Sequence, residues 1–202
     1  RRTHLASTEQ ARAALAPHGT LEPQLAAEHW RGEIPLPQAV AAFYEQVGPL
    51  GNWINERVGH AGLTVPTAGN PFSIPPLARL WSAQAGYRWH GITGERLAAW
   101  PDHWLVVADQ GADPFILDLN TGAIQFARHG AGAWDDDEPL FADILEMAAC
   151  LGTVGQVWDE AGEDIFADDY SVNPVHRARL VEGLAPLIGA DRAEDLADVF
   201  GW

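Results

Sequence analysis

Three aspartates, Asp109, Asp113 and Asp118, lie close together in the stretch ADQGADPFILD. Carboxylates that converge in an open pocket and have strongly shifted pKa values can act as general acids or bases. The same residues also suit structural positions, because an aspartate beside a turn accepts hydrogen bonds from backbone N–H groups. Asp113 precedes Pro114, which restricts the chain there to extended conformations. The pattern therefore predicts either a catalytic group or a set of turn-forming residues, and the structural role alone accounts for all three.

The familiar signatures of enzymes and metal sites are missing from the sequence. A phosphate-binding loop needs a lysine, whereas all 12 basic residues are arginines, and no complete G-x-G-x-x-G, G-x-S-x-G or H-E-x-x-H motif occurs. The one cysteine, Cys150, lies in an apolar run and is expected in the core. His103 and His129, at the ends of predicted strands, have no recognisable nucleophile beside them. We therefore expect a protein that is not an enzyme and that holds no metal or cofactor.

The composition indicates a protein partner rather than nucleic acid or a membrane. The chain has 28 acidic and 12 basic residues, and its formal net charge of −16 repels phosphate backbones and anionic lipid. A basic protein surface suits this charge. No apolar run approaches the roughly 18 residues that span a bilayer, and no hydrophobic segment follows the two N-terminal arginines. We expect a cytoplasmic protein.

Acidic residues are concentrated in a long segment without a single arginine, from His129 to Val175. Two of its tryptophans, Trp134 and Trp158, are each followed by acids. An exposed aromatic ring with an acidic rim is typical of a binding anchor, and half-buried packing of the ring is the alternative. The acids also fit a solvated surface and a helix N-terminus. The predicted partner-binding residues are Trp134, Asp135, Asp136, Asp137, Glu138, Trp158, Asp159, Glu160, Glu163 and Asp164.

The elements that would position these residues are helices on either side of a strand cluster. WLVVA at 104–108 is a short apolar run typical of a strand covered on both faces. Two further strands are predicted at 115–119 and 123–128, joined by a short turn, and one brief strand within the loop 48–75. Helices are predicted at 7–16, 21–30, 37–47, from 77 onward, and at 138–151, 174–188 and 191–200. This order predicts an α+β fold with a central, mainly antiparallel sheet wrapped by helices and with extra N- and C-terminal helices.

The strand cluster also resembles the core of a known family. The residues that carry the resemblance are Trp104, Ala108, Asp109, Gly111, Asp113, Pro114, Phe115, Asp118, Gly122 and Ile124. Upstream, Leu36-Pro37, Phe43-Tyr44 and Gly48 are similar to the first helix of that family, and 141–145 is similar to its closing helix. The family is the SUKH superfamily, named in part for the yeast cell-wall-synthesis regulators.

The SUKH resemblance implies a division of the chain and a function. It implies a helical N-terminal extension (1–34), a SUKH-like α+β domain (35–151) and an acidic helical C-terminal extension (152–202) packed on the same domain. Most bacterial members are regarded as immunity proteins that bind and neutralise toxins of polymorphic systems, and fungal members are regulatory scaffolds. No catalytic residue is attributed to the family.

Three functions are open on this basis. The leading hypothesis is an immunity protein that binds a basic toxin domain and blocks it sterically. The first alternative is a regulatory scaffold of the cell-wall-regulator type with another partner, and the second is an enzyme that uses Asp109, Asp113 and Asp118. The gene neighbourhood separates the first two, and convergence of the three carboxylates in one pocket would favour the third.

Overall fold

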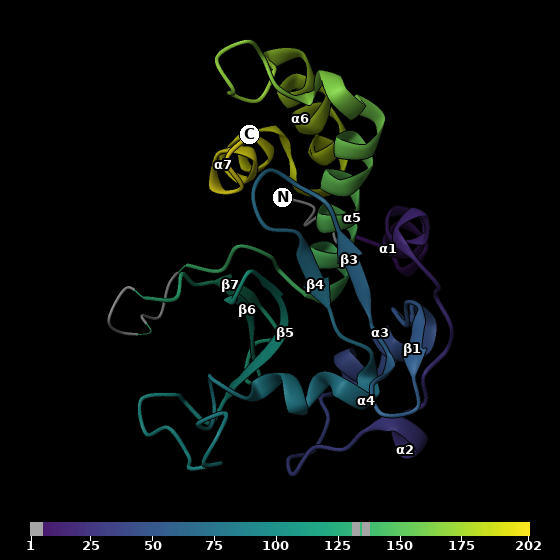
Figure 1. Cartoon of the computed structure of the whole chain (residues 1–202), viewed down its shortest axis with the longest axis vertical. Coiled ribbons are helices and arrows are strands. Elements are labelled where there is room, and N and C mark those ends of the chain that lie inside the picture. Colours follow the sequence, from purple (N-terminus) through teal and green to yellow (C-terminus); the bar gives the residue numbers. More distant parts are fainter. Residues whose placement is uncertain (1–5, 131–133, 135–137) are drawn as a thin grey trace.

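The computed structural model of the chain describes residues 6–130, 134 and 138–202. Within these ranges it contains seven α-helices and two antiparallel sheets, so the predicted α+β class is confirmed. Figure 1 shows three of the helices above the sheet, at one end of the molecule. They are α5 (Ile144–Ala161), α6 (Pro174–Ile188) and α7 (Ala190–Val199).

The larger sheet is an antiparallel meander whose five strands follow one another in chain order. Its strands are β3 (Leu63–Val65), β4 (Phe72–Ile74), β5 (Trp104–Gln110), β6 (Asp113–Asp118) and β7 (Ile124–Phe126). The strands predicted between 104 and 128 are confirmed, and so is the brief strand predicted within 48–75. The sequence does not predict β4, or the separate hairpin of β1 (Trp53–Asn55) and β2 (Gly59–His60). Two or three residues are too few for an alternating pattern to be visible.

β5 is buried on both faces, as its apolar run predicts. Leu105 and Val107 belong to the main hydrophobic core, which includes side chains of α5, α6 and α7. Trp104 and Val106 belong to a second cluster, because successive side chains of a strand point to opposite faces. This second cluster consists of Trp100, Trp104, Val106, Ile116 and Ala127, with Tyr87 and Trp134 packed against it.

Trp100 and Tyr87, from the chain between β4 and β5, pack on the second face of the sheet. This chain contains α4 (Leu77–Leu80), η2 (Ser82–Gln84) and the loop 85–103. The buried side chain of Gln84 makes two hydrogen bonds to the backbone of Val106, donating to its carbonyl at 2.8 Å and accepting from its N–H at 2.9 Å. Arg88 donates to the carbonyls of Asp102 and Trp104, at 2.9 and 2.7 Å. These contacts fasten the loop to the edge of β5.

The N-terminal helices differ from the prediction in one place. α1 (Thr8–Leu15) begins at Ser7 with the predicted capping box, and α3 (Gln38–Gln46) buries the predicted apolar face. The helix predicted at 21–30 is wrong in its extent, because α2 covers only Ala26–His29. Residues 21–24 are instead tied to the end of α3, where the Glu22 N–H donates to the Gly48 carbonyl at 2.9 Å.

The helix predicted at 138–151 is displaced along the chain. Its first part is extended, and the Ile124 N–H donates to the Phe141 carbonyl at 2.9 Å. α5 begins only after its N-cap, Asp143, and continues to Ala161. The proposed division of the chain at 151 therefore falls inside α5. This helix contacts α1, α3, α6 and β3, and a Cβ added at Gly152 would lie 2.5 Å from the backbone of Ala14, so glycine permits the close approach of α1.

The C-terminal end of the chain completes the main core. Phe200 is 3% exposed, and its ring centroid lies 4.8 Å from that of Phe72. The buried indole of Trp202 donates to the hydroxyl of Thr67 at 3.1 Å. The residues after α7 thus reach back across the sheet, and the helices that follow 151 share a core with the strands.

Candidate functional site

The Asp109 carboxylate lies beside the turn between β5 and β6. It accepts a hydrogen bond from the N–H of Ala112, and burial raises its pKa above the ordinary value despite that bond. The two turn residues, Gly111 and Ala112, have φ values of 59° and 78°, the positive φ at both positions that type I′ hairpins require. An alanine is unusual there. The predicted turn-forming role of Asp109 is confirmed.

The Asp113 carboxylate connects the first residue of β6 to the end of the meander. It accepts hydrogen bonds from the His129 N–H at 2.8 Å and from His129 Nδ1 at 2.5 Å. Its second oxygen lies 3.8 Å from the Arg128 guanidinium. The imidazole of His129 is more than half exposed, so this pair lies at the surface and ties 128–129 to the sheet.

Asp118 is placed at the opposite end of β6. It accepts the N–H of Asn120 at 2.7 Å and so holds the turn before β7, as predicted. Asp118 pairs with Trp104 and Asp113 pairs with Gln110, at the two ends of the β5–β6 ladder. Five residues of strand correspond to about 17 Å. The three carboxylates therefore do not converge in one site.

The Tyr87 hydroxyl is hydrogen-bonded to the turn between β5 and β6. It donates to the Ala112 carbonyl at 2.8 Å. Burial, followed by the negative charges of Asp109 and Asp113, raises the pKa of Tyr87 to about 12. The phenol is therefore protonated at neutral pH, and it acts as a hydrogen-bond donor that secures the turn rather than as a base.

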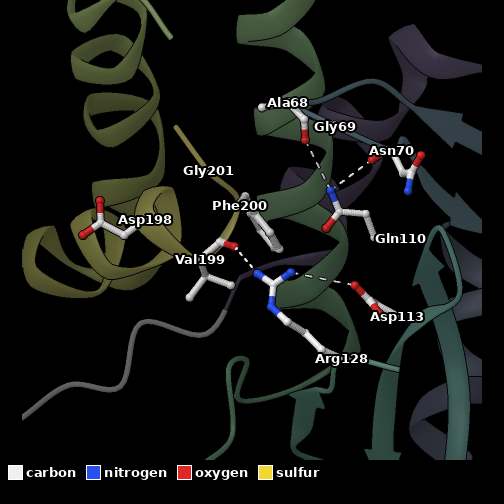
Figure 2. A pocket seen from close by; sticks show the side chains of 10 residues that line it. All are labelled: Ala68, Gly69, Asn70, Gln110, Asp113, Arg128, Asp198, Val199, Phe200 and Gly201. Atoms are coloured by element: carbon white, nitrogen blue, oxygen red, sulfur yellow. Dashed lines mark hydrogen bonds and ion pairs between the residues drawn. The ribbon is translucent and has the colours of Figure 1, made fainter. Parts of the chain in front are cut away.

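A pocket of about 280 Å³ lies between this hairpin and the end of α7. Figure 2 shows Arg128 between the two, donating to the Val199 carbonyl at 3.2 Å and lying near Asp113. Across the pocket, the Gln110 amide donates to the Asn70 carbonyl at 3.0 Å. The polar groups that line the pocket thus bind one another, and they join the sheet to the C-terminal segment.

The acidic residues of 159–169 lie together at the surface, at the end of α5 and in the connection to α6. Six of them are exposed: Asp159, Glu160, Glu163, Asp164, Asp168 and Asp169. Two of the six also contact a buried histidine. Asp159 lies 3.6 Å from Nδ1 of His18, and Asp164 lies 3.1 Å from Nε2 of His176. The remaining surface of these carboxylates faces solvent.

The two candidate tryptophans are half-buried, which is the packing alternative of the sequence analysis. Trp134 packs against Tyr87 and Trp100, with ring centroids 5.8 and 5.5 Å away. Trp158 packs against Phe166 and Trp202, at 5.7 and 6.1 Å. Of the acids that follow Trp134, Glu138 is exposed, whereas Asp135, Asp136 and Asp137 lie outside the described residues.

Three exposed apolar side chains beside the acidic cluster were not predicted from the sequence. Phe166 is 46% exposed, Tyr170 is 87% exposed and Val175 is 48% exposed. One signal was available, since Tyr170 directly follows Asp168 and Asp169 in a stretch without apolar periodicity. The large side chains at this surface are therefore not the predicted tryptophans but these three.

Comparisons of the chain with family models, with curated proteins and with solved structures each give no match. The SUKH resemblance thus stays a prediction that rests on the residues quoted above. None of the helices in the described part of the chain combines the length and the apolar character needed to cross a bilayer. Within the same part, no three His, Cys, Asp or Glu side chains gather as a metal site would require.

Proposed function

We propose that this chain is a non-catalytic, cytoplasmic protein-binding domain that neutralises a basic toxin domain, as an immunity protein does. The observation that carries the proposal is the uneven charge of the chain. Residues 129–202 contain 17 of the 28 acidic residues and three of the 12 arginines, a net charge of −14. Residues 1–128 contain the other 11 and nine, a net charge of −2.

A charge distributed in this way suits recognition of a basic protein surface. A concentration of one sign of charge attracts an oppositely charged partner over long range and raises the association rate more than the final affinity. Rapid association favours an inhibitor that must reach a toxin before the toxin reaches its target. The SUKH resemblance supports the same function independently of the charge.

The structural hydrogen bonds of the aspartates in the meander also favour a binding function over catalysis. The aspartates of the meander hold turns and lie at opposite ends of the β5–β6 ladder. By contrast, the side chains of Glu160, Glu163 and Asp168 are exposed and make no hydrogen bond or ion pair within the part of the chain that the structure describes. Exposed acids that make no contacts within the protein are available to bind a partner.

The proposal is tested with the purified product of the gene adjacent to this one. We expect the two proteins to copurify, and we expect the association rate to fall about tenfold when Glu160→Gln, Glu163→Gln and Asp168→Asn are combined. The matched control combines Glu22→Gln, Glu33→Gln and Glu45→Gln, which removes three exposed charges near α2 and α3. The control should change the rate less than about twofold, because charges far from the contact are screened beyond about 10 Å at 0.1 M salt.

Three results would contradict the proposal or the part that it assigns to the acidic surface. If the adjacent gene product does not bind, or if this chain fails to protect cells that express it, the immunity function is wrong. If the product binds and is not toxic, the regulatory scaffold is the better function. An equal loss of rate in both triple variants would show that net charge acts, without a directed acidic surface.

A further inference from the structure

The connection between α5 and α6 and the first turn of α6 together present an apolar surface beside the acidic cluster. We name Phe166, Tyr170 and Val175 the connection patch; the three side chains are 46%, 87% and 48% exposed. In Figure 1 this connection is the light-green loop at the top of the view, which projects beyond the helices. Large apolar side chains grouped on a surface are typical of a contact site.

The backbone of the connection is held in one shape. Phe166 pairs with Val172 in an antiparallel bridge. The Ala167 N–H donates to the Ser171 carbonyl, and the Tyr170 N–H donates to the Ala167 carbonyl, both at 2.9 Å. Ile165, at the start of the loop, is 4% exposed and belongs to the main core. A loop that is already ordered loses little conformational freedom when a partner binds it.

The charges beside the connection patch are negative. Glu163 and Asp164 are exposed in the short 3-10 helix that follows α5, and Asp168 and Asp169 are exposed in the loop after it. Hydrogen bonds from the Ser171 hydroxyl and N–H hold the pKa of Asp169 below its usual value, so it is ionised at neutral pH. The arginine nearest in the chain, Arg177, is already paired with Glu194 and Asp198, at 2.5 and 2.6 Å.

We infer that the connection patch is the contact centre for a basic protein surface, with Tyr170 as its aromatic anchor and the neighbouring acids as its rim. Tyrosine is enriched among binding hot spots, because its ring contributes a large contact area and has few rotatable bonds. The acidic rim favours a partner with a positively charged surface. This inference rests on the proposed function and names the surface that carries it out.

A second exposed apolar surface provides the comparison. Trp53 and Ile54 of β1 are 58% and 53% exposed, and Trp53 stacks edge-on against His60 at 5.3 Å. Its neighbours Glu56 and Arg57 carry opposite charges, so this hairpin offers no net charge to a basic partner. β1 lies well below the connection in Figure 1, and a partner centred on one surface leaves the other free.

The test measures the Kd of the purified adjacent gene product for four forms of this chain. Tyr170→Ala should weaken binding at least about tenfold, mainly through faster dissociation, whereas Tyr170→Phe should stay within about threefold of the wild type because the ring remains. The control Trp53→Ala should bind like the wild type. Tyr170 is exposed, so its replacement leaves the core intact, and equal melting temperatures verify that each variant is folded.

The outcomes separate the two proposals. Wild-type binding with a loss confined to Tyr170→Ala supports the connection patch. Wild-type binding with an unchanged Kd for Tyr170→Ala overturns the patch and leaves the proposed function standing. An equal loss in Tyr170→Ala and Trp53→Ala also overturns it. Absence of binding by the wild type overturns the proposed function, and the patch with it.

Discussion

The two parts of the chain on either side of His129 differ greatly in charge but share one interior. The first part is nearly neutral, at −2, and supplies the meander; the second, at −14, supplies α5, α6 and α7. The main core contains residues from both parts. The acidic residues of the second part therefore lie mostly at the surface, whereas its apolar side chains form one core with the strands of the first part.

Only one acid of the second part is buried among the described residues. Glu146 is 1% exposed, accepts the Ala142 N–H at 3.0 Å and pairs with Arg192. The other acids that the structure describes there are half-exposed or fully exposed. A buried carboxylate needs a partner to offset the loss of hydration. The second part contains only three arginines that could pair with its acids. The remaining acids are therefore either exposed to solvent or bound by a partner protein.

The largest expected effect tests whether the second part is needed for the core. Phe200→Ala should lower the free energy of unfolding by about 3–5 kcal/mol, because it removes a buried ring packed against Phe72, Phe115 and Phe126. Val175→Ala, at an exposed position of α6, is the control and should change it by less than about 0.5 kcal/mol. Urea unfolding measures both. A loss below about 1 kcal/mol for Phe200→Ala would mean that the C-terminal segment is an accessory to an independent domain.

The sequence predicts those features that a local pattern determines. The capping box at Ser7, the apolar run of β5 and the turn after Asp118 each need only a few neighbouring residues. The start of α5 could not be predicted, because Leu140 and Phe141 fit the apolar face of the helix that follows, whereas in the structure both form backbone hydrogen bonds with Ile124. The extent of α2 depends likewise on the distant carbonyl of Gly48.

The candidate site was harder to predict than the fold. An acidic neighbourhood looks the same in the sequence whether a tryptophan packs inward or outward, so Trp134 and Trp158 could not be distinguished from anchors. Trp134 packs against Tyr87 and Trp100, and Trp158 packs against Trp202. These partners are distant in the sequence, and only the fold brings them together. Tyr170 lies in a loop that is closed by backbone hydrogen bonds, and side-chain patterns in the sequence do not reveal such a loop.

An intermediate effect is expected from a matched pair of aspartates, one from each part. Asp118→Ala should lower the free energy of unfolding by about 1 kcal/mol, because the N–H of Asn120 loses its acceptor. Asp168→Ala, in the exposed connection, should change it by less than about 0.5 kcal/mol. Thermal and urea unfolding of the two variants give the comparison directly. Equal losses would show that the acids of the connection also have a structural role.

The smallest effect concerns the carboxylate that burial disfavours. Burial raises the pKa of Asp109, so the ionised carboxylate destabilises the folded state. The stability that the protonated carboxyl group contributes is fully present below the ordinary aspartate pKa of about 3.9. It is lost as the pH rises through the pKa of the folded state. Asp109→Asn keeps an oxygen for the Ala112 N–H and removes the charge. We expect this variant to be more stable than the wild type at neutral pH, by less than about 1 kcal/mol since the group is partly exposed.

The pH dependence separates this local effect from a general one. Any acid removed from a chain of net charge −16 reduces self-repulsion, and Asp168→Asn measures that contribution at an exposed position. Melting temperatures taken from about pH 7 down to about pH 3 should show the advantage of Asp109→Asn over Asp168→Asn shrinking as Asp109 becomes protonated in the wild type. An advantage that is constant across this range would mean that burial of the charge is not its cause. In that case the amide itself would be the better partner for the turn.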